Sequence, residues 1–161
     1  MTEGIPNSDL HLHIIYENQK KGFKADAVYC ALAVNDIARP IFGQVSFNIY
    51  NMFEQDDNPV VFNNDLEITI HEIIHIVGFS ANAMYYWMNP KTNKRYGKEY
   101  KKDLQIEKTI RKIKTVFLTS KNVVEVTRKY YNCPTAEGMQ IENQGGQGTQ
   151  GAHWEKTIIF N

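Results

Sequence analysis

Hydrophobic side chains recur every three or four residues between positions 64 and 78, which predicts an amphipathic helix in the middle of the chain. Asn64 and Glu67 have the spacing of a capping box, so the first turn is expected there. Gly78 follows the last repeat and can adopt the positive φ that ends a helix. The apolar stripe of this predicted helix contains Leu66, Ile70, Ile73, Ile74 and Val77.

Alternating polar and apolar positions predict two strands before this helix, over residues 9–17 and 41–50. Residues 30–37 are interpreted as a loop or short helix, and residues 51–59 as an acidic loop. One side of the second strand carries Val45, Phe47 and Ile49. Strands beside a single long helix indicate an α+β fold with a small sheet.

The pattern after the helix is weaker. Residues 82–102 are rich in Asn, Lys and Tyr and are expected to be irregular, whereas residues 106–117 fit a helix or a strand. Ser120 is a suitable N-cap for a second helix that reaches about Tyr131. Residues 133–151 resemble a loop.

Length and composition indicate one soluble domain. The chain has 161 residues, of which 42% are hydrophobic and 22% charged, as in ordinary globular proteins. No apolar run approaches the ~20 residues that a membrane-spanning helix needs.

The formal net charge is zero, but it is unevenly distributed. Residues 91–129 contain 13 Lys and Arg against 4 Asp and Glu, and the remainder contains 5 against 14. A solvated surface segment explains this block most simply. The second interpretation is attraction to anionic substrates or to a membrane surface. No nucleic-acid-binding signature accompanies it, so nucleic acid is not an expected partner.

The predicted helix contains the motif H-E-x-x-H at residues 71–75. Residues four apart lie on one helix face, so His71 and His75 can ligate one Zn²⁺. Glu72 lies beside the first ligand and can reach a zinc-bound water without binding the metal. The motif therefore predicts a zinc site with Glu72 as its catalytic residue.

A catalytic zinc usually has three protein ligands and one open position. The compact pattern H-E-x-x-H-x-x-G-x-x-H would put the third ligand at Ala81, which cannot serve. His153 is the one histidine farther along, whereas His11 and His13 alternate in the first predicted strand and are interpreted as strand residues. A glutamate ligand also stays open, although the chain lacks the N-E-x-x-x-E helix typical of such enzymes; the candidates are Glu99, Glu107, Glu125, Glu137 and Glu142.

These motifs resemble the leishmanolysin family of surface zinc peptidases, in which a long insertion separates the second and third histidines. The metal segments that carry the resemblance are residues 71–80, 143–149 and 153–156. Four further segments resemble the family around its cysteines and its R-P-x-x-G motif, at residues 29–31, 39–43, 120–124 and 131–133.

The resemblance implies a metzincin-like catalytic domain with a small twisted sheet, an active-site helix and an insertion at residues 81–142. It implies one Zn²⁺ held by His71, His75 and His153, whose activated water hydrolyses peptide bonds in protein or peptide substrates with Glu72 as general base. The strand around residues 44–49 is expected to border the substrate cleft and to pair with an extended substrate.

Family members continue past the third ligand into a Met-containing turn and a Cys-rich region. The resemblance therefore implies that residues 1–161 form a single but incomplete domain without this C-terminal part, with weak or no peptidase activity and a marginal stability that zinc increases. It also implies an extracellular or membrane-associated cell-surface location, where Cys30 and Cys133 would tend to be oxidised. The alternative is a truncated homologue that binds zinc or a partner, for example in adhesion, without hydrolysis.

Residues 146–151 match G-x-G-x-x-G, the fingerprint of a dinucleotide-binding turn. That fingerprint needs a strand before it, a helix after it and an acidic residue about 20 positions farther on. The chain ends ten residues after the motif, so we interpret these glycines as bends that let His153 reach the zinc.

Overall fold

The computed structural model describes residues 7–33, 38–52, 59–144 and 149–156. Contacts between residues divide the chain into two compact units, Met1–Phe79 and Ser80–Asn161, and each is described here by itself. Both units combine small sheets with helices, which confirms the predicted α+β class.

The first unit contains a three-stranded sheet of β1 (His11–Glu17), β2 (Ala25–Leu32) and β3 (Pro40–Asn48). Its order is β1-β3-β2, with β1 parallel and β2 antiparallel to β3. The two predicted strands are confirmed as β1 and β3.

Two expectations about this sheet are wrong. Residues 30–32 belong to β2 rather than to a loop or short helix, because pairing with β3 stabilises a segment of weak strand propensity; residues 34–37 lie outside the described residues. The segment at residues 44–49 cannot pair with an extended substrate as an edge strand, because β3 pairs on both sides. Among the described strands, the sheet edges are β1 and β2.

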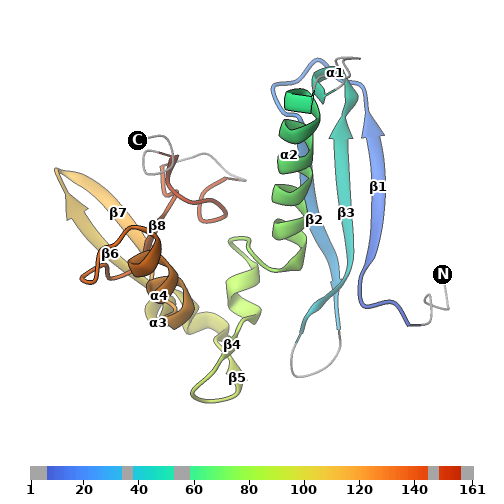
Figure 1. Cartoon of the computed structure of the whole chain (residues 1–161). Helices are drawn as coiled ribbons and strands as arrows, with labels where there is room; N and C mark the ends of the chain where they lie inside the picture. Colours follow the sequence, from blue (N-terminus) through green and yellow to red (C-terminus); the bar gives the residue numbers. More distant parts are fainter. Residues whose placement is uncertain (1–6, 34–37, 53–58, 145–148, 157–161) are drawn as a thin grey trace. The chain divides into compact units, whose positions relative to one another are not determined.

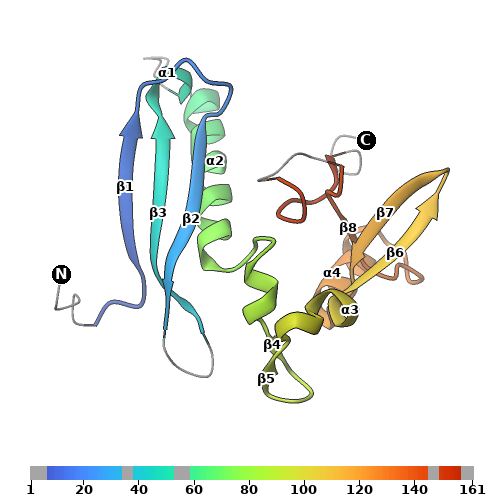
Figure 2. The ribbon, with the colours of Figure 1, turned by 180° about the vertical axis from the view of Figure 1, so that it is seen from behind.

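Helix α2 (Pro59–Val77) runs along the sheet (Figure 1), and the view from behind shows the strand order with the helix beyond it (Figure 2). The helix starts at Pro59, not at Asn64, so the predicted capping box is wrong. Proline suits a first helical position because its fixed φ and missing N–H cost nothing there. The predicted end is confirmed, since Gly78 has φ 143°. Before α2, the short helix α1 (Ile49–Met52) replaces the expected end of the strand and start of the acidic loop, and residues 53–58 lie outside the described part.

The face of α2 that meets the sheet is not the predicted apolar stripe. The buried residues of α2 are Glu72 and Ile76. A Cβ atom on Gly43 of β3 would lie 2.4 Å from Cγ2 of Ile76, so the helix rests on the sheet through this face. Four of the five stripe residues are instead 44–54% exposed: Leu66, Ile70, Ile74 and Val77.

The second unit starts with short elements, in agreement with the irregular segment predicted there. They are the 3₁₀ turns η1 (Ala83–Tyr86) and η2 (Gly97–Glu99), helix α3 (Tyr100–Leu104), and a small antiparallel pair, β4 (Met88–Asn89) with β5 (Lys94–Arg95).

Its larger sheet is antiparallel, in the order β6-β7-β8. Of the two predicted alternatives, helix or strand, residues 106–117 form strands. Arg111 and Lys112 both have positive φ, 51° and 68°, and this turn reverses the chain between β6 and β7. Leu104, Leu118 and Met84 are fully buried here. The strands are β6 (Gln105–Ile110), β7 (Ile113–Leu118) and β8 (Met139–Ile141).

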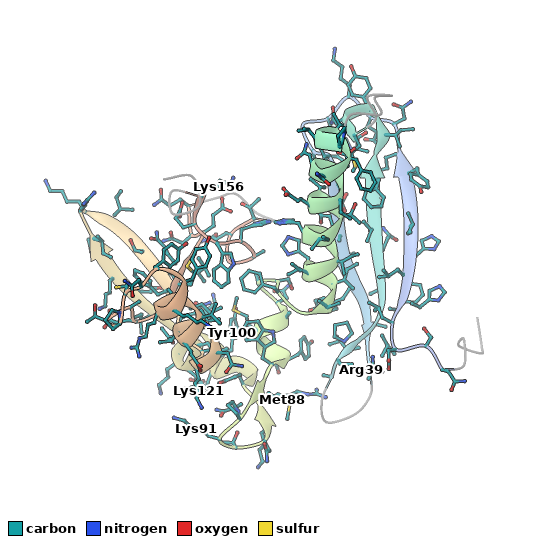
Figure 3. The ribbon with its side chains drawn as sticks, in the orientation of Figure 1. Arg39, Met88, Lys91, Tyr100, Lys121 and Lys156 are labelled. Atoms are coloured by element: carbon teal, nitrogen blue, oxygen red, sulfur yellow. The ribbon has the colours of Figure 1, made fainter. Side chains whose placement is uncertain are left out.

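Helix α4 (Lys121–Tyr130) begins directly after Ser120, as predicted, and Lys121 is labelled in Figure 3. The expected loop at residues 133–151 is only partly correct, since it contains β8. All 13 Lys and Arg side chains of residues 91–129 are exposed, which supports the solvated-surface interpretation. Within the described residues, no helix is both long enough and apolar enough to cross a membrane.

Candidate metal centre

The two motif histidines lie together on α2. Their Nε2 atoms are 3.0 Å apart, and the rings meet edge to face with an interplanar angle of 88°. Two ligands of a tetrahedral zinc with bonds of 2.0–2.1 Å lie about 3.3 Å apart. The helix therefore presents two nitrogens at a separation that one zinc ion can bridge.

The ring of His75 is oriented by the end of its own helix. Its Nδ1 lies 2.7 Å from the carbonyl oxygen of Phe79, which can only accept a hydrogen bond. The neutral ring must then carry its proton on Nδ1, and Nε2 carries the lone pair that a metal needs. Because the helix ends at Gly78, the chain can bring the Phe79 carbonyl back to His75.

Glu72 lies on the sheet-facing side of α2 and is 7% exposed. Burial raises the pKa of its carboxyl; His75 lowers this pKa to a lesser extent, and the negative charge of Asp26 raises it further. A general base works best when its pKa is close to the working pH. The surroundings of Glu72 raise its pKa, and so shift it toward neutral pH.

His153 lies in the second unit, on a segment that pairs with the end of β8. The pairing is set by a bridge between Ile141 and Trp154, and the N–H of Glu142 donates to the carbonyl of His153 at 2.8 Å. Gly151 has φ 78°, which supports the interpretation of this glycine as a bend before His153. The glycines at positions 145, 146 and 148 lie outside the described residues.

The ring of His153 has the same arrangement as that of His75. Its Nδ1 lies 3.1 Å from the carbonyl oxygen of Thr149, so the neutral ring donates there and carries its lone pair on Nε2. Imidazole nitrogens of this kind are typical zinc ligands. In each unit, the local structure thus leaves a histidine Nε2 with the lone pair that zinc needs. That all three histidines bind one ion stays a prediction.

The other histidines behave as strand residues. His11 stacks on Phe42, its partner on β3, with ring centroids 5.0 Å apart, and His13 is exposed on the same strand. Of the glutamates considered as a third ligand, four are exposed, namely Glu99, Glu107, Glu125 and Glu137. Glu142 is buried beside His153. Sequence reasoning missed that pairing, since no local pattern connects two residues that meet only through strand register.

Comparison with known proteins places the chain in a family whose model is named for peptidases. The Peptidase M8 family model, described as leishmanolysin, matches residues 1–161. The chain belongs to the leishmanolysin family, and the resemblance noted from its motifs is confirmed.

Individual relatives are similar over nearly the whole chain. A leishmanolysin-like peptidase of Drosophila melanogaster is 29% identical over 99% of this chain and 27% of its own length. A leishmanolysin homolog of Crithidia fasciculata is 29% identical over 96% and 21%, and leishmanolysin of Leishmania major is 25% identical over 95% and 22%. The chain therefore spans about a quarter of the length of the curated relatives it matches.

Proposed function

We propose that this chain forms the zinc-binding core of a metallopeptidase of the metzincin type, which hydrolyses peptide bonds in protein or peptide substrates. The observation that carries the proposal is the His71–His75 pair, with its Nε2 atoms 3.0 Å apart and Glu72 between the two in sequence. Membership of the leishmanolysin family supports the same activity.

In this proposal His71, His75 and His153 hold one Zn²⁺ through their Nε2 atoms. Zinc bound there would lower the pKa of a water molecule toward neutrality and polarise the scissile carbonyl. Glu72 would accept a proton from that water on its carboxylate and return it to the leaving amine. Its burial supports this role, because burial raises the pKa of the carboxyl and so makes the carboxylate a stronger base.

The open edge of β2 is the substrate-binding edge in this proposal, in place of the segment at residues 44–49. Strand β2 ends the described sheet, lies antiparallel to β3 and is the strand over which α2 mainly packs. An extended peptide can add to such an edge through main-chain hydrogen bonds. The N–H of Asn48 donates to the carbonyl of Lys24, so the alternation of an antiparallel ladder directs the N–H of Ala27 away from β3. Ala27→Pro removes this edge N–H, and weaker peptide binding with unchanged zinc binding is the result that this assignment predicts.

An extracellular or cell-surface location is part of the proposal and rests on the family resemblance. Both cysteines are free thiols in this structure, Cys30 in the first unit and Cys133 in the second. Thiol labelling of protein secreted by cells, before and after reduction, tests the location together with the redox state. Retention of tagged protein inside the cells would contradict it.

The main experiment separates zinc binding from hydrolysis. Purified wild-type chain and Glu72→Gln are compared for zinc content and for cleavage of a fluorogenic peptide, with Glu67→Gln, on an exposed part of the same helix, as control. We expect one zinc in all three proteins and a loss of about 10²- to 10⁴-fold in rate for Glu72→Gln alone. Unchanged turnover in Glu72→Gln contradicts the general-base role, and zinc binding without wild-type turnover favours a binding protein instead.

A further inference from the structure

Glu142 is a buried carboxylate whose position the proposed chemistry does not yet explain. Its side chain is 8% exposed, and its Oε2 atom makes no hydrogen bond. Buried polar atoms are nearly always hydrogen-bonded, so an exception calls for a specific reason. Nδ1 of His153 lies 3.5 Å from Oε2.

Strand register brings these two residues together. The N–H of Glu142 donates to the carbonyl of His153, and the N–H of Gly151 donates to the carbonyl of Glu142, both at 2.8 Å. Directly opposed residues of an antiparallel pair place their side chains on the same face. The main chain thus holds the Glu142 carboxylate beside the His153 ring, whatever the side chains contribute.

The other charged neighbour does not account for the burial of Glu142. Nζ of Lys156 lies 3.6 Å from Oε1, and this lysine, labelled in Figure 3, is 67% exposed. An ion pair with an exposed lysine is screened by water and contributes little. Removing a carboxylate from water costs more than such a pair returns. The fold therefore retains Glu142 at a net cost to stability.

We propose that Glu142 is a positioning residue for His153 as a metal ligand, an inference that rests on the proposed zinc site. The Nδ1–H of His153 donates to the carbonyl of Thr149 at 3.1 Å, which fixes the tautomer, and Oε2 of Glu142 lies 3.5 Å from the same nitrogen. The carboxylate thus places a negative charge beside the protonated side of the ring. When Nε2 donates its lone pair to a cation, the Nδ1–H becomes more polar, and a carboxylate beside it strengthens the ligand.

This placement also distinguishes Glu142 from a ligand. Glu142 was one of the glutamates that could supply a third metal ligand in place of His153. Its Oε2 approaches the ring at Nδ1, whereas the lone pair of the neutral ring is on Nε2. A carboxylate that contacts the side of the ring away from the ligating nitrogen supports that histidine and does not compete with it.

The test compares Glu142→Gln with two matched controls in the full chain. Lys156→Gln removes the other partner of Glu142, and Glu137→Gln removes an exposed charge that pairs with Lys108. Zinc affinity is measured by competition with a chelator, the Co²⁺-substituted proteins are compared by absorption spectroscopy, and thermal unfolding is measured on metal-free protein. We expect zinc binding about 10- to 100-fold weaker in Glu142→Gln and unchanged in both controls. Metal-free Glu142→Gln should unfold at the wild-type temperature or above it.

Three results would overturn the inference. Zinc affinity equal to wild type in Glu142→Gln means that the carboxylate does not support His153. An equal loss in Lys156→Gln means that the ion pair, rather than the contact with His153, is responsible. A Co²⁺ spectrum that shows a lost ligand in Glu142→Gln makes Glu142 a ligand itself. If the wild-type chain binds no zinc, the proposed function fails together with this inference. If the wild-type chain binds zinc and one of the three results is found, only the role of Glu142 is wrong.

Discussion

Ile76 of α2 and Gly43 of β3 are in such close contact that a Cβ atom on Gly43 would lie 2.4 Å from Cγ2 of Ile76. The contact sets the distance between the helix and the sheet, because Ile76 is fully buried. Glu72 precedes Ile76 by one helical turn on the same face. The approach that Gly43 permits therefore also holds the Glu72 carboxyl against the sheet.

Gly43→Ala should destabilise the protein by about 1–3 kcal/mol, because the added methyl group has no space and the helix must shift. Urea unfolding followed by circular dichroism measures the loss. Gly22→Ala is the control, since no atom lies within 4 Å of the Cβ position there. Adding Ile76→Ala to Gly43→Ala should cost less than the two separate losses combined, because the clash is gone. Additive losses would show that the two residues do not press on each other.

His153→Ala should weaken zinc binding by more than the 10- to 100-fold typical of changes outside the ligand shell, because it removes a proposed ligand. His13→Ala is the matched control, since His13 is an exposed histidine on β1. Chelator competition on both variants gives the comparison. Wild-type zinc affinity in His153→Ala would exclude this histidine as a ligand and favour a glutamate as the third ligand.

Glu72→Gln should stabilise the metal-free protein near neutral pH. Burial raises the pKa of Glu72 above its ordinary value of 4.5, so the folded state binds a proton more readily than the unfolded state. The ionised carboxylate then costs stability above the folded-state pKa, and the cost disappears as the pH falls toward 4.5. In the presence of a chelator, the variant should unfold at a higher temperature than wild type at pH 7–8. Near pH 4 the two proteins should unfold at the same temperature. If the difference in unfolding temperature between the two proteins were the same at every pH, the raised pKa of Glu72 would be contradicted.

Replacing Arg111 and Lys112 by Asn-Gly should stabilise the second unit by an amount on the order of 1 kcal/mol. Both residues have positive φ, which is unfavourable for long side chains and favoured by Asn-Gly in a two-residue hairpin. Lys108→Gly, within β6, should have the opposite effect, because glycine weakens a strand. Thermal unfolding separates the two. A less stable Asn-Gly variant would show that contacts of the native side chains outweigh the backbone strain.

Features with a local cause were predictable from the sequence. His71 and His75 share a helix face because helical geometry fixes the positions of residues four apart. Ser120 immediately precedes α4, and Gly78 ends α2 with a positive φ that glycine adopts readily. Strands β1 and β3 follow from alternation. Segment β2 has no such pattern, and its strand conformation depends on pairing with β3.

By itself, then, the sequence determined the zinc motif, its helix and the membership of a family, because these depend on residues close together along the chain. Only the tertiary structure decided which face of α2 meets the sheet: Ile76 is chosen over Leu66 and Ile70 because Gly43 leaves room for it. It alone placed Glu142 beside His153, since strand register is set by main-chain hydrogen bonds between distant segments and side-chain periodicity carries no record of it.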